Sequence, residues 1–123
     1  MLFNVALIAA GIGKAFLQSL KQDGTKVKAL AGDEAQKLSA SLATIGQLLR
    51  DGDIDQEEAE ALVDVQKNAT EAVFASLEGI GRAAARRATH AGLETAVAAV
   101  DGAIGLPLVA TVLHLPQATA AGG

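Results

Sequence analysis

The chain has 123 residues, of which half are apolar, 20% are charged and 2% are aromatic, with a net charge of −4. This length suits one domain, and the absence of Cys excludes a disulfide scaffold, a cysteine-based zinc site and a thiol nucleophile. With three Phe and no Trp or Tyr, aromatic stacking on nucleic-acid bases is unexpected. A chain rich in Ala and Gly is expected to gain burial by close helix contact, by self-association or by contact with lipid.

Charge is distributed unevenly along the sequence. Residues 1–50 carry six basic and three acidic residues, whereas residues 51–78 carry nine acidic residues and one Lys. Residues 79–123 carry three Arg and two acidic residues. A mildly acidic chain with one acidic block is a poor general nucleic-acid binder, so we expect no nucleic-acid partner. The separation of sign favours head-to-tail contacts between copies, or an acidic segment that stays in water.

Apolar residues at helical spacing predict a first helix over 2–22 and a second over 33–50. Asp33 suits the start of the second helix, and residues 25–32 fit either a linker or its first turn. The first apolar run has no basic residue before Lys14, so we expect no signal peptide and synthesis in the cytoplasm.

A polar loop at 51–55 predicts an antiparallel turn into a third helix. Asp55 and Glu58 have the spacing of a capping box at the start of that helix. Because no Pro occurs before Pro107, the third helix is predicted to run from 56 to about 100, with a bend near Gly79–Gly81 as the alternative. A helix of that length would overhang its partner and would need cover from the first helix or from other copies.

The predicted fold is therefore all-α, a single helical domain over 1–123. It comprises an apolar helix in 1–24, an antiparallel helical hairpin with one long helix in 33–100, and an apolar segment and tail in 101–123. Residues 95–113 are apolar apart from Asp101 and approach the length needed to cross a bilayer.

Two series of small or apolar residues at helical spacing predict packing faces, either within the chain or between copies. These candidate oligomer or packing residues are Leu38, Leu42, Ile45 and Leu49, and Ala84, Ala88, Gly92 and Ala96.

A third series, Arg82, Arg86 and His90, would form one stripe of a helix. The stripe could be a solvated or locally paired face, could pair with the acidic residues of 55–64 in a neighbouring copy, or could bind phosphate groups. Glu78, four residues before Arg82, is expected to pair with it within the helix.

The N-terminal helix offers a candidate membrane or partner contact at Phe3, Ile8, Ile12 and Phe16. Residues 11–20 (GIGKAFLQSL) resemble the start of magainin-type amphipathic peptides, which lie on membrane surfaces. The resemblance covers ten residues and implies a surface-active helix.

No catalytic or metal-binding arrangement is evident. Asp51, Asp53 and Asp55 alternate as in a calcium loop, but Gln56 and Leu62 stand where that loop needs Gly and Glu. The chain has only two His residues, His90 and His114, and no His-containing motif typical of a metal or catalytic site is evident. We therefore expect no enzyme activity, no metal, no cofactor and no small-molecule substrate.

These observations favour a structural subunit of a self-assembling complex, such as a virion or a secretion-type assembly, with a homo-oligomer as the expected partner state. One alternative is a membrane-associated or membrane-inserted helical protein. A second is a small soluble adaptor that binds a partner helix.

Overall fold

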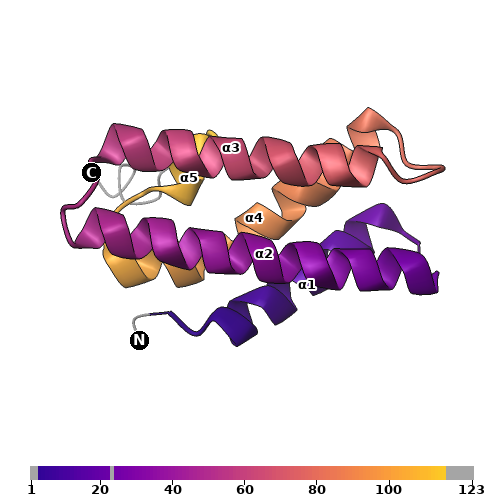
Figure 1. Cartoon of the computed structure of the whole chain (residues 1–123), viewed down its shortest axis with the longest axis horizontal. Coiled ribbons are helices and arrows are strands. Elements are labelled where there is room, and N and C mark those ends of the chain that lie inside the picture. The colour runs from indigo at the N-terminus through magenta and orange to yellow at the C-terminus, as the bar shows by residue number, and fades with distance from the viewer. Residues whose placement is uncertain (1–2, 23, 116–123) are drawn as a thin grey trace.

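The computed structural model describes residues 3–22 and 24–115, and all regular structure in these residues is helical (Figure 1). The predicted all-α fold is confirmed. The helices are α1 (Val5–Leu20), α2 (Thr25–Arg50), α3 (Gln56–Ala75), α4 (Arg82–Ile104) and the single turn α5 (Val109–Val112).

The first four helices form an antiparallel bundle in which each helix runs opposite to the one before it (Figure 1). The most extensive contact joins α1 to α4, and the next joins α1 to α2. The short α5 packs on α4 and α3. Because α1 covers α4, the first and last long helices of the chain lie side by side.

A side chain caps the start of α1, and α2 begins earlier in the chain than predicted. The Asn4 side chain accepts a hydrogen bond from the backbone N–H of Leu7 at 3.1 Å and caps α1. The second helix begins at Thr25, so residues 25–32 belong to it and not to a linker. Val27 and Ala31 extend the buried face of α2 toward its N-terminus, which places Asp33 inside the helix rather than at its start.

The turn between α2 and α3 forms as predicted. The Asp55 side chain accepts a hydrogen bond from the Glu58 N–H at 2.8 Å, and the Glu58 carboxylate accepts one from the Asp55 N–H at 3.1 Å. This reciprocal pair confirms the capping box. Gly52 has a φ of 80°, a left-handed conformation that Gly adopts readily.

The prediction of one helix from 56 to about 100 is wrong. The chain leaves the helix after Ala75 and re-enters it at Arg82, and the reversal between them is larger than the bend considered for Gly79–Gly81. Gly79 has a φ of 85°, and the neighbouring Ile80 is buried at 6% exposure. Two Gly residues weaken the helix here, and burial of Ile80 stabilises the turn instead. The turn therefore sends α4 back along α3, and the expected overhang does not exist.

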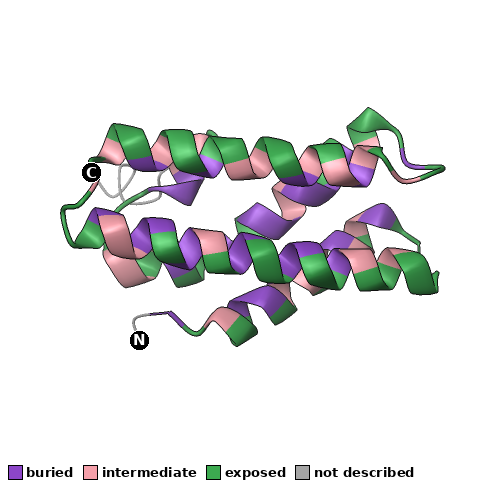
Figure 2. Cartoon of the chain, viewed as in Figure 1, coloured by how far each residue is buried: buried purple, intermediate pink, exposed green. Residues whose placement is uncertain are grey.

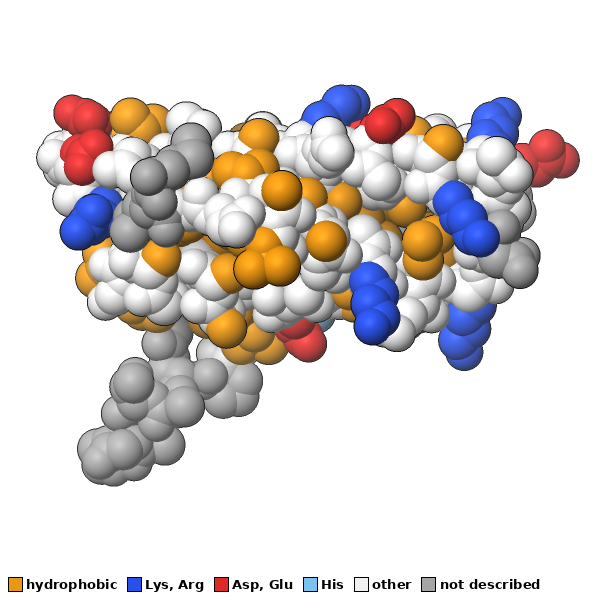
Figure 3. Space-filling model, turned by 90° about the horizontal axis from the view of Figure 1, so that it is seen from below, with side chains coloured by type: hydrophobic (Ala, Val, Ile, Leu, Met, Phe, Trp, Pro, Cys, Tyr) orange, Lys and Arg blue, Asp and Glu red, His pale blue; other side chains and the backbone are white. Residues whose placement is uncertain are grey.

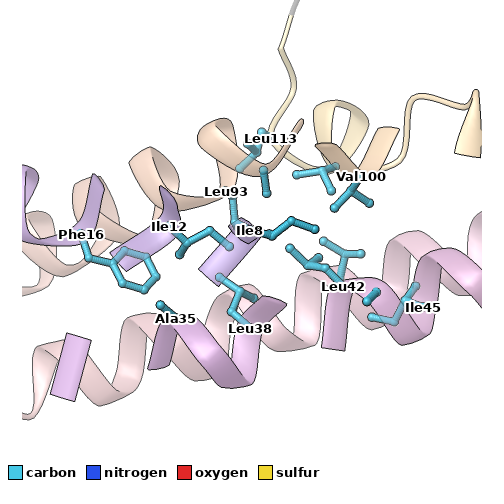
Figure 4. Close-up of a cluster of buried hydrophobic side chains, with 14 of the residues drawn as sticks. Ile8, Ile12, Phe16, Ala35, Leu38, Leu42, Ile45, Leu93, Val100 and Leu113 are labelled. Carbon is cyan, nitrogen blue, oxygen red and sulfur yellow. The ribbon is translucent and has the colours of Figure 1, made fainter. Parts of the chain in front are cut away.

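Apolar side chains from α1, α2 and α4 point toward one another between these helices (Figure 4). Ile12, Leu42 and Leu93 are fully buried there. Farther along the bundle, the rings of Phe16 and Phe74 meet edge to face with centroids 4.8 Å apart, which joins α1 to α3. The core is thus completed within one chain.

The C-terminal part of the described chain is not one continuous apolar helix. The fourth helix extends to Ile104, a little beyond its predicted end, and Gly105 then turns the chain with a φ of 73°. Leu108 and Val109 are fully buried, so the segment before α5 packs against the bundle.

Candidate interaction surfaces

The small-residue series of α4 packs inside the chain, against α1. Ala88, Gly92 and Ala96 are buried, and Ala84 is half-buried. A β-carbon built at Gly92 would lie 2.2 Å from Cε1 of Phe16. Gly92 therefore allows the Phe16 ring to lie directly on the α4 backbone. Close helix approach is present as the series suggested, but between two helices of the same chain.

The apolar series of α2 is also internal. Leu38, Leu42, Ile45 and Leu49 are all buried, at 9% exposure or less. Helices α1, α3 and α4 all contact α2, and side chains of α1 and α4 face Leu38, Leu42 and Ile45 across the core (Figure 4). The groove that an adaptor would need along these residues is filled by the chain itself. Contacts with another molecule would have to use other residues.

The four apolar residues proposed for membrane or partner contact are placed in the core as well. Phe3, Ile8, Ile12 and Phe16 are exposed by 7% or less. On the outer side of α1, Leu7 remains 70% exposed. Figure 3 looks onto the side of the bundle where α1 lies, and hydrophobic side chains gather near the middle of this face. The surface of α1 is therefore apolar mainly around its first turns.

Beside these turns lies an apolar hollow of about 370 Å³ between the N-terminal residues and α2. Phe3 forms one wall, and a β-carbon built at Gly46 would lie 2.8 Å from its Cζ atom. The residues lining the hollow are Phe3, Val5, Ala40, Ala43, Thr44, Gln47 and Leu48.

Arg82, Arg86 and His90 lie along the first half of α4, with both Arg side chains exposed and His90 half-buried. Arg86 Nε lies 3.8 Å from Glu71 Oε1 of α3, and His90 Nε2 lies 3.4 Å from Glu94 Oε1. Glu78 precedes α4 in the turn, so the helical spacing expected to pair it with Arg82 does not exist. Among the described residues, no carboxylate oxygen lies within 4.0 Å of a nitrogen of the Arg82 guanidinium.

Arg82 and Arg86 line one side of a polar hollow of about 560 Å³ between α4 and the C-terminal half of α3. Asn68, Glu71 and Ser76 contribute to the opposite side. The hollow is open to solvent and borders the outer face of α3.

The outer face of α3 carries an apolar stripe that is not among the surfaces predicted from the sequence. Leu62 is 41% exposed and Val65 is 59% exposed, and Ala69 and Ala72 continue the line at helical spacing. Figure 2 shows exposed residues along the whole upper edge of α3. We call Leu62, Val65, Ala69 and Ala72 the α3 stripe. Its signal was present in the sequence, because these four positions step by three and four residues.

Asp101 has a structural role at the end of α4. Its carboxylate accepts hydrogen bonds from the backbone N–H groups of Val109 at 2.9 Å and Ala110 at 3.0 Å, which fastens α5 to α4. Burial raises the pKa of Asp101 above its ordinary value of 3.8, and the backbone donors partly oppose that rise. The carboxylate of Asp101 is present in this apolar segment because it caps the two backbone N–H groups at the start of α5.

Replacing Asp101 by Asn is expected to change how stability depends on pH. Because the pKa of Asp101 is raised in the folded state, the folded protein binds a proton more readily than the unfolded chain. The free energy of unfolding should therefore fall as the pH rises from about 4 through the raised pKa, and Asp101→Asn should remove that part of the fall. Urea unfolding of the parent protein and of Asp101→Asn between about pH 4 and 7 measures this pH dependence. A constant difference between them over this range would contradict the prediction.

The described residues hold no group of three or more His, Asp or Glu side chains placed to bind a metal ion. The Asp51, Asp53 and Asp55 side chains lie in an exposed turn, and Asp55 is engaged in helix capping. In the described part of the chain, no helix has both the length and the apolar character required to cross a membrane.

Comparison of the chain with protein-family models, with curated proteins and with solved structures finds no match.

Proposed function

We propose that this protein is a non-enzymatic structural subunit that assembles with copies of itself, as in a virion or a secretion-type complex. The α3 stripe is its main contact surface in this proposal. The observation that carries the proposal is the exposure of Leu62 and Val65 in line with Ala69 and Ala72, on a helix whose opposite face already fills the core.

Three features of this surface support self-association. Leu and Val side chains lose unfavourable contact with water when a second apolar surface covers them. Ala69 and Ala72 are small enough to let the backbone of another helix approach closely. Lys67 is the only basic residue of α3, and its charge is already paired within the chain. Its side chain is 25% exposed, and its Nζ lies 3.6 Å from Asp64 Oδ1 and 3.9 Å from Glu71 Oε2.

Replacing Val65 by Asp is expected to abolish self-association without unfolding the chain. The change places a charge at the centre of the stripe, where covering it would cost more than the apolar contact gains. Light scattering on a sizing column, from about 10 µM to 1 mM, should show a mass that rises with concentration for the parent and stays monomeric for Val65→Asp.

Leu7→Asp is the matched control, because Leu7 is more exposed than Val65 but lies on α1. It should associate like the parent protein. A parent protein that stays monomeric at every concentration would overturn the proposed function. Association that Leu7→Asp abolishes and Val65→Asp leaves intact would move the contact from α3 to α1.

The apolar hollow beside Phe3 supports a second candidate function, that of an adaptor. A volume of about 370 Å³ is large enough for one or two apolar side chains of a partner helix. The Ala43→Leu variant would fill the hollow from α2. Loss of partner binding in this variant, with self-association unchanged, would favour the adaptor function.

A further inference from the structure

We infer that the second copy packs on the α3 stripe in the antiparallel direction, across a two-fold axis, so that Arg82 of each copy meets Glu57 of the other. This inference rests on the proposed function and adds the orientation of the partner and the residues that select it.

The sizes of the side chains along the α3 stripe favour the antiparallel direction. The two larger residues, Leu62 and Val65, lie in the N-terminal half of α3, and the two Ala residues lie in the C-terminal half. An antiparallel pair centred near Lys67 places Leu62 opposite Ala72 of the second copy and Val65 opposite its Ala69. Each large side chain then meets a small one. A parallel pair would place large against large and leave a gap between the Ala residues.

The charges at the two ends of α3 favour the same direction. Glu57 is exposed near the N-terminal end of α3, and Asp64 is exposed in the N-terminal half of the helix. At the opposite end, Arg82 and Arg86 project from α4 beside α3, where the 3.8 Å contact of Arg86 with Glu71 fastens the two helices together. The antiparallel pair brings the acidic end of one copy to the basic end of the other. The two-fold axis makes every such contact occur twice.

Arg82 is the residue best placed to select this arrangement. It has no ion-pair partner within 4.0 Å among the described residues of its own chain, and it lines the hollow beside Ala72 and Ser76. Glu57 likewise forms no ion pair within that distance in the described chain, because the capping box uses Glu58 instead. Both charges therefore remain available to a second copy.

The expected dimer is weak and depends on salt. A helix of 20 residues is about 30 Å long, and one helix face covers less area than the ~800 Å² per partner of a standard interface. We therefore expect a dissociation constant in the micromolar range. Salt screens exposed ion pairs at the rim, so the dissociation constant should rise several-fold when the salt concentration is raised from about 0.05 to 0.5 M.

Charge reversal tests the pairing directly. Arg82→Glu and Glu57→Arg should each raise the dissociation constant about tenfold or more, because each places like charges together twice in the dimer. The double variant Arg82→Glu/Glu57→Arg should restore it to within about threefold of the parent. Arg87→Glu is the matched control on the same helix and should leave association unchanged. Sedimentation equilibrium measures all five proteins, and circular dichroism checks that each is folded.

Single cysteines test the orientation, since the chain has no Cys of its own. Asn68 lies next to the expected two-fold axis, so Asn68→Cys should link two copies efficiently through a short bis-maleimide. Ala61 is also exposed on the same helix but lies two turns from the axis. Ala61→Cys should therefore link far less. Parallel packing would instead link both variants to a similar extent and would overturn the inference.

The failure of this inference and the failure of the proposed function give different results. A parent protein that is monomeric at all concentrations overturns the proposed function. A parent dimer that Val65→Asp dissociates, but that tolerates Arg82→Glu or is not restored by the double variant, overturns the antiparallel pairing alone.

Discussion

Replacing Phe16 by Ala should lower the free energy of unfolding by about 4 kcal/mol. Phe16 is fully buried, its ring meets Phe74 edge to face, and it lies directly on the backbone of Gly92. The variant loses the buried area, the ring contact and the filling of the space between α1, α3 and α4. Because domains of this size are stable by about 5–15 kcal/mol, the loss should be obvious in urea or thermal unfolding.

Leu7→Ala is the control for this change, because Leu7 lies on the same helix but is 70% exposed. It should alter the unfolding free energy by less than about 0.5 kcal/mol. If Phe16→Ala does not fold, Phe16→Leu keeps part of the volume and should lose about 2 kcal/mol. Equal, small effects at positions 7 and 16 would show that α1 does not pack as described.

Replacing Gly92 by Ala should destabilise the protein by about 2 kcal/mol, although Ala is the better helix former by about 1 kcal/mol. The new β-carbon would lie 2.2 Å from Cε1 and 2.8 Å from Cδ1 of Phe16. The ring cannot move aside freely, because Phe74 packs against it. Thermal or urea unfolding measures the loss, and steric conflict is expected to exceed the gain in helix propensity.

Gly102→Ala provides the matched control on the same helix, where a β-carbon would have no neighbour within 4 Å. It should stabilise the protein by about 0.5–1 kcal/mol. A double-mutant cycle then identifies the cause, because Gly92→Ala should cost much less in the Phe16→Ala background. Additive effects would mean that the two positions are not in contact.

The sequence was sufficient to predict the helical class, the Asp55 capping box and the packing character of the α4 series. Each of these depends on residues close together in the chain, where spacing and capping chemistry are informative. The turn at 76–81 was missed because the local cost of two Gly residues does not decide between a bend and a reversal. Burial of Ile80 and the fit of Phe16 on Gly92 decide it, and both are contacts between distant parts of the sequence.

The same limit applies to the candidate surfaces. Apolar spacing identified Leu38, Leu42 and Phe16 as residues that must be covered, but it could not say that other helices of the same chain cover them. The α3 stripe was overlooked for the opposite reason. Leu62 and Val65 stand among acidic residues, and only the fold shows which face of α3 stays in water. Pattern thus predicts that a face is apolar, and the fold shows what covers it.

The contact between α1 and α4 also determines the order in which the chain can fold. It joins the two long helices that are farthest apart in the sequence, so it requires closure of a loop that contains all of α2 and α3. Hairpins between neighbouring helices close shorter loops and are expected to form first. Docking of α1 on α4 is then a late step, and Phe16→Ala should speed unfolding while changing the refolding rate little.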